Sequence, residues 1–287
     1  MENILPNDQE PWDLEIEPAS GFFDLNWREV WQYRDLIALF VRRDIVATYK
    51  QTILGPIWFF VQPILTTLTY VIIFGNVANI STGGVPKILF YLAGVTLWNY
   101  FQECLMKTSD TFILNQNLFG KVYFPRLAAP ISIVISNLFK FFIQLSLFLA
   151  AWTFYLITTD TVQPNLTLLL FPVYLLLMSG LGFSFGVLIS SLTTKYRDLR
   201  FLIQFGVQLL MYGTPIVYPL SIVPEKYRLL LLANPITSVV EAFKYSFLGE
   251  GYFSWIGLGY SFVFMTLCLL LSILVFNRVE KTFMDTV

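Results

Sequence analysis

The chain has 287 residues, of which 56% are hydrophobic and 13% are charged, and its net charge is −1. An ordinary soluble domain carries about 25% charged residues, so this balance predicts an all-α protein whose excess apolar surface faces lipid. The absence of histidine excludes serine triads and ordinary zinc sites, because it removes the commonest general base and metal ligand.

The N-terminal residues 1–26 are acidic and contain no apolar run. We therefore predict an acidic leader rather than a signal peptide, which needs a positive start and a hydrophobic stretch. Residues 27–56 are amphipathic, with Trp27 and Trp31 on an apolar face and arginines interrupting it. This pattern favours a helix that lies in the membrane interface, followed by a turn. A core-facing helix of a soluble cap is the alternative.

Residues 57–276 contain six stretches that approach the roughly 20 apolar residues needed to cross a bilayer. The predicted spans are 57–78, 88–106, 127–157, 166–192, 201–217 and 255–276, and residues 277–287 form a tail. Most of the 18 Lys and Arg residues fall on one side when the N-terminus is placed inside. The positive-inside rule then predicts that both termini are cytoplasmic.

Between the fifth and sixth spans, residues 218–254 are apolar but interrupted by prolines and glycines. Non-helical backbone at membrane depth requires protein or a watery cavity around it. We predict short re-entrant helices at Leu229–Leu232 and Ile236–Phe247, which dip back into the outer leaflet. A small cap folded above the membrane is the alternative.

The sequence contains no recognisable energy source or catalytic site. Around Gly120-Lys121, the residues that a phosphate-binding loop requires before and after the lysine are missing. The predicted spans hold almost no charge except Glu103 and Lys140, which argues against ion-coupled transport. Lys140 is interpreted as neutralising an anionic substrate, as snorkelling toward an interface, or as pairing within an oligomer.

Aromatic side chains are abundant, at 17% of the chain. Most such residues near helix ends are lipid anchors, but together they suit a channel for sugars, whose apolar faces stack on aromatic rings. The candidates for lining a channel are Trp58, Phe59, Phe60, Tyr70, Trp98, Tyr100, Phe101, Tyr212 and Tyr218.

Four stretches carry a family resemblance. They are RDI at 43–45 with YKQTILGPIW at 49–58 and QP at 62–63, then NLFGKVYFPR at 117–126, then KYRDL at 195–199, and finally TPIVYP at 214–219 with NPI at 234–236. In this order and separation they resemble the permease subunits of ABC-2 type polysaccharide exporters over roughly residues 28–280, and the charged leader is most similar to the O-antigen members.

The resemblance implies a homodimeric permease in the bacterial inner membrane, docked onto two copies of a cytoplasmic ATPase subunit that binds ATP and Mg²⁺. Its implied cargo is an undecaprenyl-diphosphate-linked polysaccharide, moved from the cytoplasm to the periplasm. Export of teichoic acid or capsular polysaccharide, or of small hydrophobic drugs or lipids, are alternatives within the fold. A membrane-embedded glycosyl or acyl transferase is a rival from another class.

The resemblance also assigns site residues. It places Arg42, Arg43, Lys50, Leu54 and Gly55 where the lipid headgroup enters, since guanidinium groups bind diphosphate oxygens. Anchoring to anionic lipid is the alternative role for the basic residues. The segments expected to contact the ATPase contain Asn117, Lys121, Val122, Tyr123, Phe124, Pro125 and Arg126, together with Tyr196, Arg197 and Asp198. Phe119-Gly120 departs from the family pattern, in which a bulkier helix-forming pair is expected, so the resemblance does not define the extent of the coupling helix.

Overall fold

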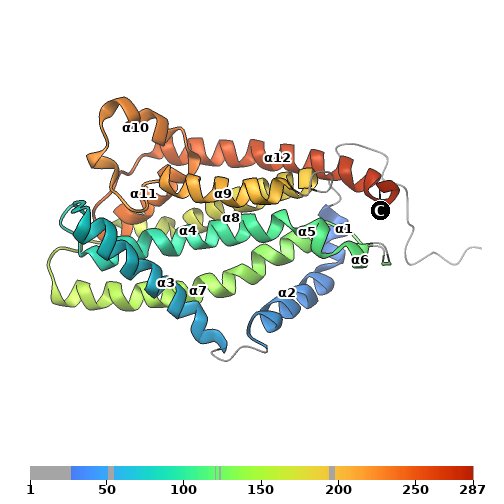
Figure 1. Ribbon diagram of the computed structural model, residues 1–287, viewed down its shortest axis with the longest axis horizontal. Coiled ribbons are helices and arrows are strands. Elements are labelled where there is room, and N and C mark those ends of the chain that lie inside the picture. Colours follow the sequence, from blue (N-terminus) through green and yellow to red (C-terminus); the bar gives the residue numbers. More distant parts are fainter. Residues whose placement is uncertain (1–26, 51–54, 120, 123, 194–197, 287) are drawn as a thin grey trace, which may run out of the picture.

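In this computed structural model the residues described are 27–50, 55–119, 121–122, 124–193 and 198–286, and they contain helices but no β-strand. Most of the long helices run side by side along one direction (Figure 1). The long helices are α2 (Arg34–Tyr49), α3 (Trp58–Tyr70) with its π-helical continuation η2 (Val71–Val77), α4 (Lys87–Ser109), α7 (Ala128–Thr158), α8 (Phe171–Thr193), α9 (Leu199–Tyr212), α11 (Pro235–Leu248) and α12 (Trp255–Thr286). The short elements are α1 (Trp27–Gln32), η1 (Gly55–Ile57), α5 (Thr111–Leu114), α6 (Gln116–Phe119), η3 (Leu166–Leu170), η4 (Leu220–Ile222) and α10 (Glu225–Leu232).

The all-helical fold predicted from the sequence is confirmed, and each predicted span coincides with a helix. Four helical stretches are long and apolar enough to cross a membrane, namely Trp58–Val77, Ala128–Thr158, Leu166–Thr193 and Trp255–Val279. Helix α4 is long but includes the charged Glu103 and Lys107. Helix α9 has 14 residues, or about 21 Å at 1.5 Å per residue. The count of six spans therefore stays a prediction.

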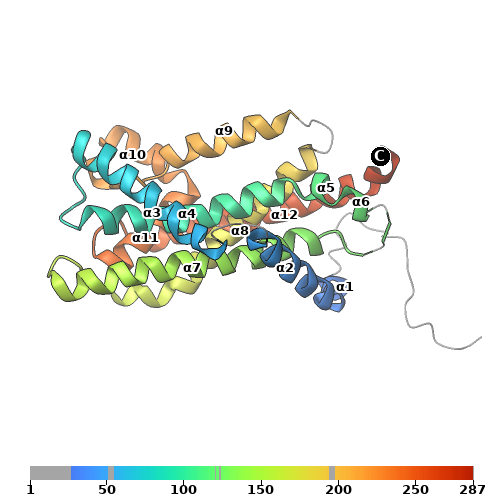
Figure 2. The same cartoon turned by 60° about the horizontal axis from the view of Figure 1, so that its bottom comes forward.

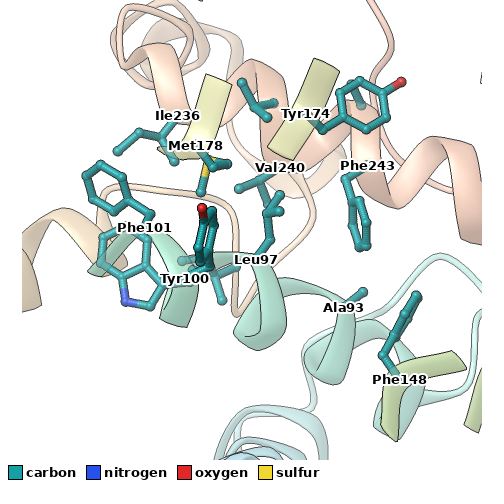
Figure 3. Packing of buried hydrophobic residues seen from close by; sticks show 14 of the residues in the cluster. Ala93, Leu97, Tyr100, Phe101, Phe148, Tyr174, Met178, Ile236, Val240 and Phe243 are labelled. Atoms are coloured by element: carbon teal, nitrogen blue, oxygen red, sulfur yellow. The ribbon is translucent and has the colours of Figure 1, made fainter. Parts of the chain in front are cut away.

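Helices α4 and α8 form the centre of the bundle. Helix α4 packs most extensively on α8, which also packs along α12. The close approach depends on small residues, because a Cβ atom on Gly186 would lie 2.6 Å from Thr108 Cβ and one on Gly182 would lie 2.8 Å from Cys104 Cβ. Spaced four residues apart, these glycines form the small-residue motif that lets membrane helices pack closely. Figure 3 shows the core beside this contact, where Phe101 and Tyr100 lie near Met178 and Ile236.

The predicted re-entrant segment forms two helices of different character. Helix α11 is almost entirely buried, whereas α10 is mostly exposed. The side chain of Asn234 caps α11 by accepting from the Ile236 amide at 3.1 Å, and Gly249 ends the helix with a φ of +78° that favours glycine. Both helices lie at the end of the bundle opposite α1 and α6 (Figure 1). Their bounds extend the predicted ones by a few residues.

The N-terminal segment folds as α1 and α2, with a break at Tyr33. Helix α2 packs on α7 and buries Phe40, while Trp31 stays 70% exposed. The arrangement leaves α2 slanted against the lower side of the bundle, facing the start of α3 (Figure 2). At the other end of the chain, α12 continues to Thr286, through most of the segment predicted as a tail.

Candidate functional site

Three charged side chains meet between α4 and α7, toward the end of the bundle that carries α5 and α6. Lys107 Nζ lies 2.8 Å from Glu103 Oε2, one helical turn earlier, and Lys140 Nζ of α7 lies 3.2 Å from the same oxygen. Lys107 also donates to Asn137 Oδ1 at 3.2 Å. Because two ammonium groups share one carboxylate, this charged cluster has one positive charge in excess.

The charged cluster borders a cavity of about 360 Å³ between α2, α3, α4 and α7. That volume lies in the range of about 300–1,000 Å³ typical of small-molecule sites. On the α2 wall Arg43 is paired with Asp44 at 2.9 Å, so these two charges balance and the excess comes from the lysines. On the α3 wall the ring of Phe59 has its centroid 5.4 Å from Lys140 Nζ. This polar cavity therefore combines cationic, amide and aromatic groups, which suit an anionic or sugar-bearing ligand.

A second, larger groove of about 820 Å³ runs along the other side of α2, against α7. Its walls are mainly apolar, including Trp31 and Ile37 from the N-terminal helices and Ile135 from α7, and Arg34 and Arg42 also line it. Helix α2 thus separates a polar cavity from an apolar groove. An amphiphile has the matching division between a charged head and a hydrocarbon tail.

The residues predicted to receive the headgroup are divided between these two hollows. Arg43 lines the polar cavity and Arg42 the apolar groove. Lys50 is exposed at the end of α2. Gly55 has a φ of +53°, which supports the predicted glycine-dependent turn before α3. Leu54 lies outside the described residues.

The predicted coupling segment is a pair of short helices followed by a turn into α7. Helix α6 is short and ends at Phe119. Lys121 and Val122 are exposed, Val122 to 53%, and both are free of the core. Phe124 is only 5% exposed, so it packs inside this chain and does not offer its ring to a partner.

Phe124 belongs to a ring cluster that joins the coupling segment to α2 and α12. Its ring centroid lies 5.7 Å from Phe40 of α2 and 5.6 Å from Phe119 of α6. Phe112 continues the cluster, with centroids 5.8 Å from Phe119 and 4.8 Å from Phe276. Helix α2 and the predicted coupling segment are therefore in direct contact through aromatic packing.

The remaining coupling residues are placed as follows. Pro125 and Arg126 are half-buried, and the Arg126 guanidinium lies 5.7 Å from the Phe119 ring centroid. Asp198 is exposed just before α9. The side chain of Asn117 is not among those described, and Tyr123, Tyr196 and Arg197 lie outside the described residues. An ion pair near this end was not expected: Arg200 Nη2 of α9 lies 2.7 Å from Asp110 Oδ2, where burial raises the pKa of Asp110 and Arg200 opposes the shift.

The aromatic candidates separate into core and surface residues. Trp98, Tyr100 and Phe101 are at most 3% exposed, so the structure gives them no surface with which to line a channel. Figure 3 shows Tyr100 and Phe101 within the core. Trp58 of α3 and Tyr212 of α9 are 49% and 45% exposed. The other candidates, Phe59, Phe60, Tyr70 and Tyr218, are half-buried, and the Tyr70 hydroxyl lies 3.2 Å from Met211 Sδ, linking α3 to α9.

Two contacts of charged residues were not predicted from the sequence. Lys140, for which no partner was identified from sequence, pairs within its own chain with Glu103. Lys244 is fully buried in α11, where its ammonium donates to the Pro215 carbonyl and lies 3.8 Å from the Phe90 ring centroid. The i, i+4 spacing of Glu103 and Lys107 is visible in the sequence, whereas the contacts of Lys140 and Lys244 depend on distant segments.

Comparison with known families decides the class of protein. A family model described as "ABC-2 type transporter" matches residues 35–248, which include α2, the charged cluster and α11. The chain belongs to the ABC-2 type transporter family. It is thus a multi-pass membrane component of an ABC transporter, which confirms the resemblance drawn from its motifs.

The curated relatives of this ABC-2 chain include export permeases and a transport protein. It is 30% identical to the O-antigen export system permease protein RfbA of Myxococcus xanthus, over 76% of this chain and 82% of the relative. It is 24% identical to a protein of the same name from Klebsiella pneumoniae, over 88% and 94% of the two chains. It is also 25% identical to the polysialic acid transport protein KpsM of Escherichia coli, over 87% and 95%.

Proposed function

We propose that this chain is the permease subunit of an ATP-driven exporter that moves undecaprenyl-diphosphate-linked polysaccharide of the O-antigen type from cytoplasm to periplasm. In this proposal the protein lies in the bacterial inner membrane with both termini cytoplasmic. It forms a homodimer on two copies of a cytoplasmic ATPase, which bind ATP and Mg²⁺. The ABC-2 relatives named for O-antigen export support this assignment.

The observation that carries the proposal is the position of α2 between the polar cavity and the apolar groove. The diphosphate would enter the polar cavity, where Lys107 and Lys140 share Glu103 and leave one positive charge unbalanced. The polyprenyl chain would lie along the apolar groove beside Ile131 and Ile135. Charge-assisted contacts favour phosphate, and burial of the hydrocarbon favours the chain, so one amphiphile satisfies both hollows.

The path of the glycan in this proposal runs between the α3 and α9 surfaces of the two copies. These helices both contact α4 and carry the exposed Trp58 and Tyr212, whose faces offer stacking surfaces to sugar rings. The exposed Lys121 and Val122 would contact the ATPase. Capsular polysaccharide is the second candidate cargo, and the likeness to the KpsM protein favours it.

The test is reconstitution of the permease and its ATPase subunit in proteoliposomes with lipid-linked glycan. The substitution Lys140→Met keeps the Glu103–Lys107 pair but removes the excess charge. We expect about a tenfold higher glycan concentration for half-maximal ATPase stimulation, because one hydrogen bond to a charged group is lost. Lys226→Met, an exposed lysine of α10 at the opposite end, is the matched control and should behave as the parent. Stimulation by drugs but not by lipid-linked glycan would refute the proposal.

A further inference from the structure

A small cavity of about 130 Å³ lies at the α10–α11 end of the bundle, far in sequence from the charged cluster. Its walls come from the loop before α4, from η4 and α10, from α11, and from the turn between α11 and α12. The residues lining it are Thr82, Phe90, Pro219, Leu220, Ser221, Arg228, Glu241, Glu250, Gly251 and Tyr252. Nothing in the export scheme above uses this outer cavity.

Glu241 gives the outer cavity a buried acceptor without a partner. The residue is 1% exposed, and its Oε2 accepts from the Tyr252 amide at 3.1 Å. The Leu220 amide also faces this carboxylate, but among the described residues no group forms a hydrogen bond of good geometry with Oε1. The nearby Lys244 ammonium is directed to the Pro215 carbonyl instead. A buried carboxylate oxygen left in this state is unfavourable unless a ligand or water completes it.

Arg228 provides an unpaired donor on the same wall. Its Nε is buried and has no hydrogen-bond partner among the described residues, while its Nη2 reaches the Leu220 carbonyl at 3.5 Å, the outer limit of a hydrogen bond. The outer cavity is therefore lined by a carboxylate oxygen of Glu241 that lacks a donor and by the Nε–H of Arg228 that lacks an acceptor. A hydroxyl group supplies both, since it donates one hydrogen bond and accepts others.

Charge and size restrict the ligand further. Glu241 and Glu250 are balanced by Arg228 on the wall and by Lys244 behind it, so the site favours a neutral ligand over an ion. The volume of about 130 Å³ exceeds the ≳ 10–15 Å³ needed for one water and is smaller than the pockets of about 300 Å³ or more that hold drug-sized molecules. Tyr252, 48% exposed, adds an aromatic face at the rim.

We propose that the outer cavity is a saccharide subsite, which binds one sugar unit through its hydroxyl groups at Glu241 and Arg228, with the ring against Tyr252. The proposal rests on the glycan cargo proposed above and adds a contact on the side where the polymer leaves. A sugar is neutral, carries adjacent hydroxyls and has an apolar face, so it matches the unpaired groups, the charge balance and the aromatic rim together.

The experiment is saturation-transfer NMR on the full chain in lipid nanodiscs. The probes are the methyl glycosides of glucose, galactose, mannose, rhamnose and N-acetylglucosamine, and empty nanodiscs give the background. We expect transfer to the ring protons of at least one glycoside. In Arg228→Met the dissociation constant should rise about tenfold, because a charged donor is lost. In Tyr252→Ala it should rise about threefold through loss of stacking.

Exposed neighbours on α10 are matched controls. Lys226→Met and Tyr227→Ala make the same kinds of change outside the outer cavity and should leave the dissociation constant unchanged. Absence of transfer to all five glycosides, as expected for a cavity that holds only water, would overturn the inference. Saturation transfer to a glycoside that neither Arg228→Met nor Tyr252→Ala weakens would also overturn the inference. The measurement needs no ATPase, so its failure beside successful export by the parent protein would refute this subsite alone.

Discussion

A single methyl group added at Gly186 tests the packing of the central helices. In Gly186→Ala the new Cβ would lie 2.6 Å from Thr108 Cβ and 2.9 Å from the Leu105 carbonyl oxygen. Carbon atoms in good contact are about 3.5–4.0 Å apart, so α4 and α8 would have to separate locally by roughly 1 Å. The Leu105 carbonyl oxygen belongs to the backbone, so it cannot move aside as the end of a long side chain can.

Two opposing effects set the change in the free energy of unfolding of Gly186→Ala. Replacing glycine by alanine inside a helix gains about 1 kcal/mol from helix propensity. Overpacking a close contact costs about 1–3 kcal/mol, and here it affects the most extensive helix pair in the bundle. We expect a net destabilisation of up to about 2 kcal/mol, which corresponds to an apparent Tm lower by up to about 4 °C in a chain of this size.

The assay is thermal unfolding of the purified chain in detergent, followed by loss of the monodisperse peak on size-exclusion chromatography. Gly206→Ala on α9 is the matched control, because nothing lies within 4 Å of its added Cβ. This variant gains the higher helix propensity of alanine without a steric clash, so its Tm should equal or exceed that of the parent protein. If Gly186→Ala were as stable as Gly206→Ala, the tight α4–α8 contact would be wrong.

Three further substitutions test the end of the bundle that carries α5 and α6. Val122→Asp changes an exposed side chain of the predicted coupling segment. Copurification with the ATPase subunit should therefore fall, while the thermal stability of the permease stays unchanged. A loss of thermal stability would contradict the exposed position of Val122. Phe124→Ala should lower the free energy of unfolding by about 3 kcal/mol, because it leaves a cavity in the ring cluster. Amide hydrogen exchange should then increase in residues 34–49, and unchanged protection there would refute the contact between Phe124 and Phe40. Arg200→Ala removes the ion pair with Asp110. Because the Arg200 side chain is 50% exposed, we expect the free energy of unfolding, measured with urea or heat, to fall by only about 0.5–1 kcal/mol. A much larger fall would show that the ion pair behaves as a buried one.

Helix positions were predictable from the sequence because hydropathy is a local property. The stretch 166–192 became η3 and α8, ending at Thr193, whereas the fifth span, predicted over 201–217, became α9 and ends earlier, at Tyr212. Helix α11 was predictable because Asn234-Pro235 is a strong start signal and Gly249 a strong stop signal. What hydropathy does not give is depth in a bilayer, so the span count remains open to experiment.

The site was predicted less well because its contacts join distant segments. Trp98 and Phe101 resemble exposed interfacial aromatics in sequence, yet α8 and α11 cover them in the folded chain. The contact of Lys140 with Glu103 spans 37 residues, and no local spacing indicates it. Phe124 likewise looked available to a partner, because only the folded chain shows Phe40 beside it.

The ring cluster has a mechanical consequence. Because Phe40, Phe119 and Phe124 are close-packed, the turn after α6 cannot shift far without displacing α2, and α2 forms one wall of both hollows proposed for the lipid. A displacement of the turn after α6 is therefore transmitted to α2 by steric contact between the rings. Salt screens exposed charges but leaves such contacts intact, so this linkage should transmit as well in concentrated salt as in dilute buffer.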